Sequence, residues 1–463
     1  MCSLRSPDAV TVRRPGLAPL LAKELRDVLS GRALWTMLLI LCPLVGYSFF
    51  QAVALYGEAS GAARDSPLLA TGLSPLDGVL VPTFGALYVA VTLLFPFVAI
   101  RTLGREKESG TLRLLIQLPY RVSTLIAAKM ATIGTAWIIA ATPVLSALLI
   151  WKLLGGHLHP AETLNLLLGQ FLYGLLVGAI ALFAAAISES SATAAIVTLA
   201  FTIGSWVLDF ALAGQPGMLE WISRLSLTQT LRPFEQGVLS LGLLLGIIVA
   251  SGAFATLAGL WLHPGVPLRT KLARSLACLG TAAVAFALAT QVGRSVDVSE
   301  DRRNSFPAAD ERALAELHEP LAVTVRLAPE DPRYVDLRRN VLAKLQRAMP
   351  NVTIRLATLG QSIIGSTSDE AYGEIEYSYG GRSVTTRSTS HREALPLIYE
   401  LAGRPVPMPI PGDDYPGYPL NAGAEAALPW FFAALPLLIA LAWWWSRRAP
   451  RIPRQLIEDG GKP

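Results

Sequence analysis

The chain alternates long apolar stretches with short polar ones, which is the pattern of a protein that crosses a membrane several times. An apolar stretch of about 18 residues or more is long enough to span a bilayer as a helix. Eight stretches qualify, at residues 34–55, 79–100, 125–154, 164–187, 194–212, 238–262, 272–289 and 428–445. The sequence therefore predicts a mainly α-helical, polytopic membrane protein with about eight transmembrane helices.

The long interval between the last two predicted spans has the pattern of a small α/β domain. Asp331-Pro332 is a helix-start signal, and Gly380-Gly381 is a favoured hairpin turn between two alternating strands. The expected elements are a strand at 321–327, a helix after Asp331-Pro332, a strand at 352–356, a hairpin within 372–389 and a helix at 392–401. A proline-rich stretch at 404–420 is expected to form a stiff linker back to the membrane.

The composition supports the membrane assignment and narrows the class of function. Hydrophobic residues make up 52% of the 463 residues and charged residues 16%, whereas soluble domains carry about 25% charged residues. The formal charge of +5 is small for this length, which argues against a nucleic-acid-binding protein. Cys2, Cys42 and Cys278 are too few and too dispersed for a disulfide framework or a zinc site.

The lysines and arginines predict the orientation, because the cytoplasmic loops of membrane proteins carry an excess of them. With a cytoplasmic N-terminus, 20 of the 39 basic residues lie in inner segments and four lie in the three short outer loops. Residues 292–427 hold the other 15, and this segment is too long for the rule to apply. Both termini are therefore expected in the cytoplasm, with residues 292–427 outside it.

These assignments divide the chain into five parts. They are a cytoplasmic tail with an amphipathic helix at 1–33, a six-span domain at 34–262, an inner loop with the seventh span at 263–291, an extracytoplasmic α/β domain with its linker at 292–427, and the eighth span with a basic cytoplasmic tail at 428–463.

The tail before the first span has the pattern of an amphipathic helix. Within residues 17–32, leucines and Val28 share one helical face, whereas Lys23, Glu24 and Arg26 share the other. Such a helix is expected to lie in the inner membrane interface. The alternative, a helix packed in a soluble core, is disfavoured so close to a membrane span.

A charged stretch followed by a short apolar one, "GREKESGTLRLLIQLPYR", lies between the second and third predicted spans. Thr111 is predicted to cap a short helix over 112–118, Gly110 to permit a tight turn before it, and Pro119 to follow its end. A short helix at the inner mouth of the spans suits docking to a cytoplasmic partner. From the residue types alone, an ordinary loop helix is equally well supported.

The sequence contains no catalytic or cofactor-binding pattern. It lacks the GxxxxGK[ST], HExxH and GxSxG motifs and any paired-cysteine metal spacing, so no catalytic or metal-binding residue is predicted and the chain is not expected to be an enzyme. His157 and His159, near Glu162, fit a solvated loop better than a weak metal site. Asp209 lies near the outer end of the fifth span. Its sequence position fits a functional group and a simple contact with the membrane interface equally well.

The charged stretch and the span behind it resemble the hallmark of ABC-2 type transporter permeases. In "REKESGTLRLLIQLPYRVSTLIAAKM", the residues Glu108, Gly110, Thr111, Pro119 and Lys129 match the family pattern. This resemblance implies that the short helix is a coupling helix, which sits in a groove of a separate cytoplasmic ABC ATPase subunit.

The resemblance extends over about residues 17–262, including "KELR" in the amphipathic helix and "RLSLTQTLRPFEQGVLSLG" before the sixth span. The residues it implies in ATPase coupling are Glu106, Glu108, Gly110, Thr111, Leu112, Leu115 and Pro119, with a second inner contact at Ser188, Glu189 and Ser190 and an interfacial helix marked by Lys23, Glu24 and Arg26. It also implies a second permease subunit and surrounding membrane lipids, in the bacterial inner membrane. No cofactor is expected to bind directly, because the partner ATPase uses the ATP and Mg.

The arrangement of a span, an outer α/β domain and a last span resembles a shortened auxiliary subunit of gliding-motility-type ABC transporters. The expected function is therefore that of a permease subunit, which couples ATP hydrolysis by a separate ATPase to movement of a substrate across the inner membrane. The alternative is a membrane anchor that transports nothing and whose outer domain binds an envelope partner. A membrane-embedded enzyme is disfavoured.

Overall fold

The computed structural model describes residues 17–64, 70–118, 120–211, 226–292, 294–328, 331–349, 351–356, 372–408, 410 and 415–448. Within these residues, eight helical segments are long and apolar enough to cross a membrane. They are Ala33–Ala63, Leu76–Glu108, Val122–Leu153, Pro160–Ile187, Ser191–Leu208, Leu241–Leu262, Leu268–Thr290 and Glu425–Arg448. The predicted fold class, a polytopic helical protein with a small α/β domain, is confirmed.

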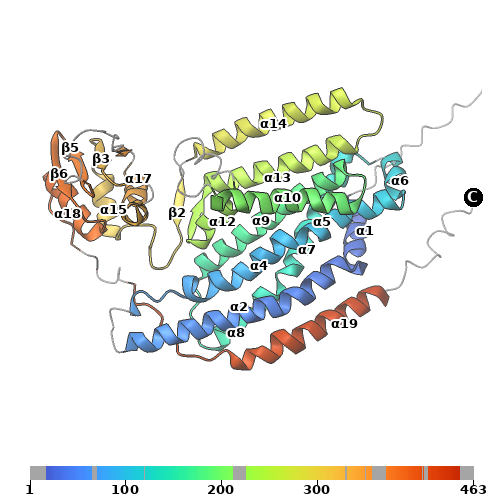
Figure 1. The fold of residues 1–463 in the computed structure, drawn as a ribbon, viewed down its shortest axis with the longest axis horizontal. Helices are drawn as coiled ribbons and strands as arrows, with labels where there is room; N and C mark the ends of the chain where they lie inside the picture. The colour runs from blue at the N-terminus through green and yellow to red at the C-terminus, as the bar shows by residue number, and fades with distance from the viewer. Residues whose placement is uncertain are drawn as a thin grey trace, which may run out of the picture.

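The spans lie side by side in one bundle, preceded by the short helix α1 (Leu17–Ser30) (Figure 1). The remaining helices of the bundle are α2 (Ala33–Arg64), η1 (Leu76–Leu80), α4 (Val81–Leu93), α5 (Phe95–Glu108), α6 (Thr111–Gln117), α7 (Val122–Ala140), α8 (Thr142–Leu153), α9 (Pro160–Ile187), α10 (Ser191–Ala211), α12 (Leu227–Glu235), α13 (Leu241–Leu262), α14 (Leu268–Thr290), η3 (Glu425–Ala427), η4 (Trp430–Ala434) and α19 (Leu435–Arg448).

In the second and third spans a new helix starts at a proline. Pro96 is the second residue of α5, which directly follows α4, and Pro143 is the second residue of α8, which directly follows α7. Proline has no backbone N–H and its ring clashes with the preceding turn, so a helix breaks or restarts there. Each span nevertheless remains long enough to cross the bilayer.

Helix α9 is the centre of the bundle and packs against α13, α5, α10, α12 and α7. Gly174 permits one of these close approaches, because a Cβ atom at this position would overlap the indole ring of Trp137 on α7. Small residues at helix crossings are the usual way for membrane helices to approach one another. By contrast, α14 packs mainly on α13 and leaves most of its surface exposed.

The α/β domain contains a four-stranded mixed sheet in the order β4-β3-β5-β6. Its elements are α15 (Ala308–Ala315), β3 (Leu321–Val325), α16 (Pro332–Leu337), η2 (Arg338–Leu342), α17 (Ala343–Ala348), β4 (Val352–Leu356), β5 (Ile375–Tyr379), β6 (Arg382–Thr386) and α18 (His391–Ala402). Asp331 caps α16 by accepting from the Arg333 N–H, and Gly380 and Gly381 both have positive φ in the hairpin. The predicted strands, capped helix and hairpin are thus confirmed.

The sixth span begins later than predicted, because residues 238–240 are extended. They form β1 (Val238–Ser240), which pairs antiparallel with β2 (Ser295–Asp297), and Ser240 caps α13. Apolar character alone did not distinguish a short strand from the start of a helix. The pairing joins the bundle to the chain that leads into the α/β domain.

Side chains strengthen this junction. The His157 ring stacks on Tyr418 with 3.6 Å between ring centroids, and its Nε2 lies 2.8 Å from Glu300 Oε2. Tyr56 donates a hydrogen bond to the carbonyl oxygen of Tyr418 at 2.7 Å. His157 is therefore part of the contact between bundle and domain rather than a solvated loop residue.

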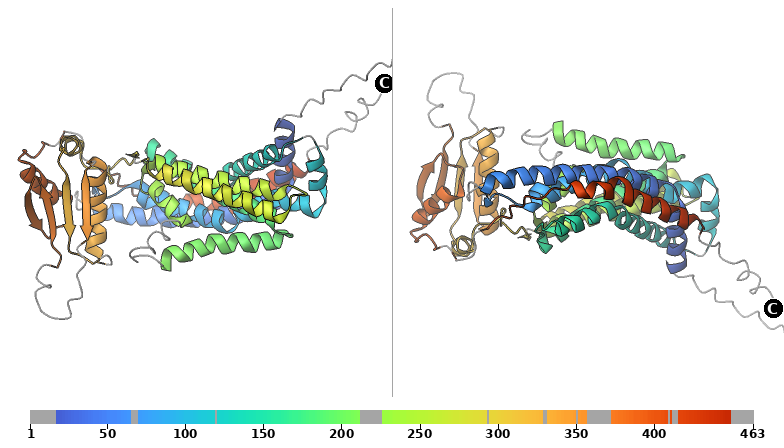
Figure 2. Two further views of the ribbon diagram at one scale, coloured as in Figure 1. Left: turned by 90° about the horizontal axis from the view of Figure 1, so that it is seen from above. Right: turned by 90° about the horizontal axis from the view of Figure 1, so that it is seen from below.

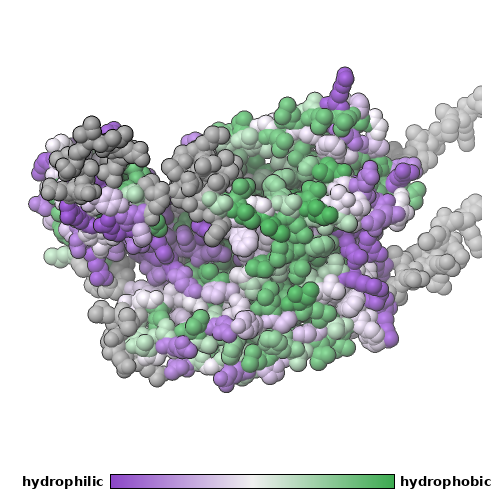
Figure 3. All heavy atoms as spheres, in the orientation of Figure 1, coloured by the Kyte–Doolittle hydropathy of each residue, from purple (hydrophilic) through white to green (hydrophobic). Residues whose placement is uncertain are grey.

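The bundle has two different ends. Helices α1 and α6 and the C-terminal end of α19 lie at one end, whereas the α/β domain lies at the other (Figures 1 and 2). Between them, hydrophobic residues cover most of the visible side of the bundle, and hydrophilic residues gather at both ends (Figure 3). This distribution is the one expected of a protein held in a bilayer by its middle section.

Candidate functional site

The short helix predicted between the second and third spans is present as α6, but its start differs from the prediction. Gly110, at φ +74°, is the residue before the first helical turn, and no side chain caps the helix. Thr111 is already helical, and its hydroxyl is 2.8 Å from the Ser109 hydroxyl instead. The predicted Thr111 cap is thus wrong, because the left-handed turn at Gly110 places Thr111 inside the first turn.

Helix α6 presents leucines to its surroundings. Leu114 is 64% exposed and Leu118, directly after the helix, is 47% exposed. Leu112 is buried in the core and fixes the helix to the protein, whereas Leu115 is half-buried and lines the cavity described below. Pro119 lies outside the described residues. Leu114 is not among the predicted contact residues, because the helical register that exposes it depends on which face meets α5.

The turn between α9 and α10, predicted as a second inner contact, is held against the end of α5. Lys107 Nζ donates to the carbonyl oxygens of Ala185, Ala186 and Ser188 at 2.7, 2.7 and 2.8 Å. A cation at the C-terminus of a helix satisfies carbonyls that have no partner within the helix. Lys107 therefore attaches the end of α9 to α5.

A second contact joins the same two segments, since Ser191 donates a hydrogen bond to Glu108 Oε1 at 2.6 Å. Ser188 is buried, whereas Glu189 and Ser190 are exposed beside it. The two predicted inner contacts thus form one continuous surface. We call it the α6 surface; its exposed residues are Glu108, Arg113, Leu114, Leu118, Glu189 and Ser190.

A buried ion cluster lies behind the α6 surface. Lys129 of α7 is fully buried and lies 2.7 Å from Glu106 of α5, and both carboxylate oxygens of Glu24 of α1 are 3.1 Å from its Nζ. Its Nζ also donates to the Thr102 carbonyl oxygen at 2.6 Å. Lys23 pairs with Glu106 and Glu24 from the rim. The lysine cluster, defined as Lys23, Glu24, Glu106 and Lys129, thus joins three helices.

The cluster corrects two predictions. Glu24 was placed on the polar, exposed face of the amphipathic helix and Glu106 among the contact residues of a partner, yet both are almost fully buried. The reason is that α1 packs against α5 and α7 with its Glu24 side inward, where the buried Lys129 requires carboxylate partners. Arg26 is exposed, as expected for the polar face.

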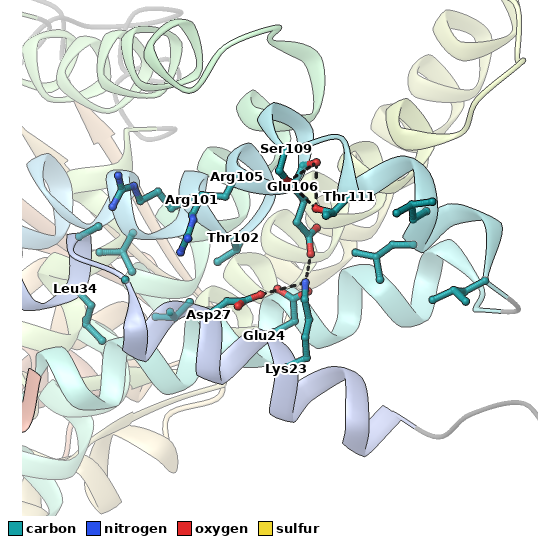
Figure 4. Close-up of a pocket in the computed structure, with 17 residues that line it drawn as sticks. Lys23, Glu24, Asp27, Leu34, Arg101, Thr102, Arg105, Glu106, Ser109 and Thr111 are labelled. Carbon is teal, nitrogen blue, oxygen red and sulfur yellow. Dashed lines mark hydrogen bonds and ion pairs between the residues drawn. The ribbon is translucent and has the colours of Figure 1, made fainter. Parts of the chain in front are cut away.

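An open cavity of about 520 Å³ lies between α1, α5 and α6 (Figure 4). Its lining combines Lys23, Glu24 and Glu106 of the lysine cluster with Arg101 and Arg105 of α5 and with Leu114, Leu115 and Leu118. Burial lowers the pKa of Lys23, but hydrogen bonding to Glu106 and the charges of Glu106 and Glu24 outweigh burial and raise it. Lys23 is therefore charged, and the cavity wall is amphipathic.

The described residues do not form a metal centre, since no group of three His, Cys, Asp or Glu side chains among them is placed to hold an ion. The Glu162 carboxylate accepts a hydrogen bond from the backbone N–H of Glu300 at 2.6 Å, in the junction described above. The side chain of Asp209 lies outside the described part of the chain.

A family model described as ABC-2 family transporter protein matches residues 18–292, which extends from α1 to the end of α14 and so includes the seventh span. Comparison with curated proteins and with solved structures finds no match. The matched region contains the lysine cluster and the whole α6 surface, and it has no nucleotide-binding domain. The chain is therefore a multi-pass membrane protein that belongs to the ABC-2 transporter family, with residues 18–292 as its permease domain.

Proposed function

We propose that this protein is the permease subunit of an ABC transporter in the bacterial inner membrane and that a separate cytoplasmic ATPase docks on the α6 surface. The observation that carries this proposal is the pair of exposed leucines, Leu114 and Leu118, on a short helix at one end of the spans. Exposed apolar side chains rimmed by charged residues are typical of protein contact sites. Lys23, Asp27 and Arg105 line the same cavity as both leucines and provide such charged neighbours.

The contacts behind the surface suggest how movement of the ATPase reaches the spans. Lys107 attaches α5 to the end of α9, and Lys129 attaches α5 to α7 and α1. A displacement of α6 would therefore move several helices together rather than bend one loop. Such rigid-body movement is one of the standard ways in which a local event changes the state of a whole domain. We propose that it drives export or movement of a substrate, with ATP and Mg held by the ATPase.

A second permease subunit, identical or different, is expected to complete the transporter, because the coupling mechanism of this class uses two permease halves and two ATPases. The α/β domain and the last span would correspond to a shortened auxiliary subunit fused to the permease. The alternative function is a membrane anchor without transport. Hydrolysis of ATP by the reconstituted complex, stimulated by a lipid or a peptide, would favour the transporter over the anchor.

The orientation is predicted from the basic residues, which favour the α6 end as the cytoplasmic one. A cysteine in place of Ser378, on β5 of the α/β domain, is expected to react with a membrane-impermeant thiol reagent in intact cells. A cysteine in place of Ser109, beside α6, is expected to react only after the membrane is opened. The reverse labelling would place α6 outside and remove the basis for ATPase docking.

The proposed function is tested by purifying the permease together with its ATPase. Gly110→Val is expected to distort the turn before α6, because a β-branched residue resists positive φ at a cost of roughly 1–3 kcal/mol. Beyond the two chain neighbours, no atom lies within 4 Å of a Cβ added at this position, so we expect the effect to come from the backbone. Glu108→Lys reverses a charge on the α6 surface and removes the acceptor for Ser191.

Both variants are expected to insert normally and to lose either association with the ATPase or stimulated ATP hydrolysis. Arg382→Ala, on the hairpin of the α/β domain, is the control and should behave like the parent. If Gly110→Val and Glu108→Lys both bind and stimulate the ATPase like the parent, α6 is an ordinary loop helix.

A further inference from the structure

A second cavity, of about 400 Å³, lies in the α/β domain, outside the residues that match the ABC-2 family. The loop before α15, helix α15 itself, helix α17 and the first half of α18 contribute to it. Tyr415 and Val406 of the linker complete its wall. Its volume falls in the range of small-molecule sites, which is about 300–1,000 Å³.

Lys344 of α17 is the unusual residue of this cavity. Its side chain lines the cavity, yet the residue is only 8% exposed. Among the described residues, none accepts a hydrogen bond from its ammonium group or pairs with it within 4 Å. Its Nζ lies over the Phe306 ring, 5.8 Å from the ring centroid. Burial lowers the pKa of Lys344, and the charges of Asp297 and Asp301 oppose that shift. An ammonium group at a cavity wall that has no hydrogen-bond partner in the described part of the chain is available to an anionic ligand.

Two further nitrogen-bearing side chains line the same cavity at the start of α18. The His391 ring lies 6.3 Å from Phe306 between centroids, and Arg392 follows it on the exposed side. Burial lowers the pKa of His391, and the charges of Lys344 and Arg392 lower it further. No ion pair joins Arg392 to the described part of the chain. Lys344, His391 and Arg392 thus line one cavity, and all three carry nitrogen donors.

The acidic residues of the lining are engaged elsewhere. Asp301 accepts hydrogen bonds from the backbone and side chain of Arg303, which it also pairs with at 2.8 Å. Asp310 Oδ1 accepts a hydrogen bond from the Tyr399 hydroxyl at 2.8 Å. Arg303 is in turn paired with Asp77 of the bundle. Among the described residues, Lys344 and Arg392 have no ion-pair partner within 4 Å, although the charges of Asp297 and Asp301 act on Lys344 from farther away, so both cations can contribute to binding an anion.

We propose that this cavity is a binding site for a phosphate monoester, with Lys344, His391 and Arg392 around the phosphate and the apolar wall around the organic part. A phosphate monoester carries up to two negative charges and three acceptor oxygens, which matches a lysine, an arginine and a further donor better than a single carboxylate does. Leu395, Pro396 and Val406 provide the apolar wall. The ligand is either a soluble phosphate ester or the headgroup of phosphatidate in the adjacent membrane.

The test is calorimetric titration of the purified full-length chain in detergent with phenyl phosphate as the probe and benzoate for comparison. Phenyl phosphate is expected to bind saturably and more tightly than benzoate. Lys344→Met keeps the apolar stem, and Arg392→Ala removes an exposed cation that the fold does not need. Each is expected to weaken phenyl phosphate binding by about tenfold or more, the usual effect of losing one charged hydrogen bond. Arg382→Ala, a cation of the same domain outside the cavity, should leave binding unchanged.

The two ligand sources are separated by repeating the titration in phosphatidylcholine nanodiscs with and without phosphatidate. Weaker binding of phenyl phosphate in the presence of phosphatidate would identify the lipid headgroup as the ligand, and equal binding would identify a soluble ester. Three results would overturn the proposal: a parent chain that binds no phenyl phosphate, variants Lys344→Met and Arg392→Ala that bind like the parent, or an equal loss in Arg382→Ala. Because ATPase association is not measured, the outcome is independent of the function proposed for α6.

Discussion

Replacing Lys129 with methionine is expected to lower the free energy of unfolding by about 3–5 kcal/mol, the usual cost of removing one partner from a buried ion pair. Methionine retains the apolar stem, so packing changes little. The two carboxylates that lie 2.7 and 3.1 Å from Nζ, on Glu106 and Glu24, would keep only Lys23 as their cation. The measurements are the midpoint of thermal unfolding in detergent and the rate at which protease cleaves α1, which packs against α7.

A double-mutant cycle separates the ion cluster from general damage. Glu106→Gln removes the charge that lies nearest to Lys129, so Lys129→Met combined with Glu106→Gln is expected to lose less stability than the two single losses added together. Lys152→Met, at an exposed lysine near the end of α8, is the control and should unfold like the parent. Strictly additive losses, or a parent-like midpoint for Lys129→Met, would mean that the cluster does not hold α1, α5 and α7 together.

Replacing Leu114 and Leu118 with serine is expected to weaken association with the ATPase by roughly 100-fold, without changing the stability of the permease. Each exposed leucine contributes about 1.5 kcal/mol when a partner buries it, and about 3 kcal/mol in total corresponds to this factor. Serine adds no charge, so long-range attraction between the partners is preserved. The measurement is the dissociation constant of the detergent-solubilised pair, together with the ATPase rate at saturating ATP.

Val335→Ser is the matched control, because Val335 is also an exposed apolar residue but lies on α16 at the opposite end of the molecule. It is expected to leave the dissociation constant unchanged. If the leucine double variant binds the ATPase with parent affinity, the docking surface is elsewhere on the protein. If instead the double variant unfolds at a lower temperature, Leu114 and Leu118 contribute to the fold and are not free for a partner.

The local sequence pattern predicted an element correctly wherever the residues of that element alone decide its structure. The eight spans follow from length and apolar composition, because a bilayer requires every backbone group of a spanning segment to be satisfied within a helix. The hairpin at Gly380-Gly381 and the capped start of α16 follow from residues that directly impose backbone geometry. For the same reason the position of α6 was correct to within one residue.

The local sequence pattern did not predict features that depend on contact with a segment far away in the chain. The extended residues 238–240 depend on pairing with 295–297, and the exposure of Leu114 depends on how α6 packs on α5. The role of Lys107 depends on α9 ending beside α5, which no spacing along the chain records. Lys344 has the sequence context of an ordinary helical lysine, and only the fold of the α/β domain buries it.

The sequence by itself determined the membrane class, the number of spans, the α/β domain and the stretch that resembles a coupling helix, because these depend on apolar length, periodicity and turn chemistry. Only the tertiary structure decided which charges are buried. Glu24 and Glu106 are 82 positions apart along the chain and share Lys129, because α1, α5 and α7 converge at one end of the bundle. A buried cation needs a carboxylate within a few ångströms, whichever segment provides it, and that requirement acts through space rather than along the sequence.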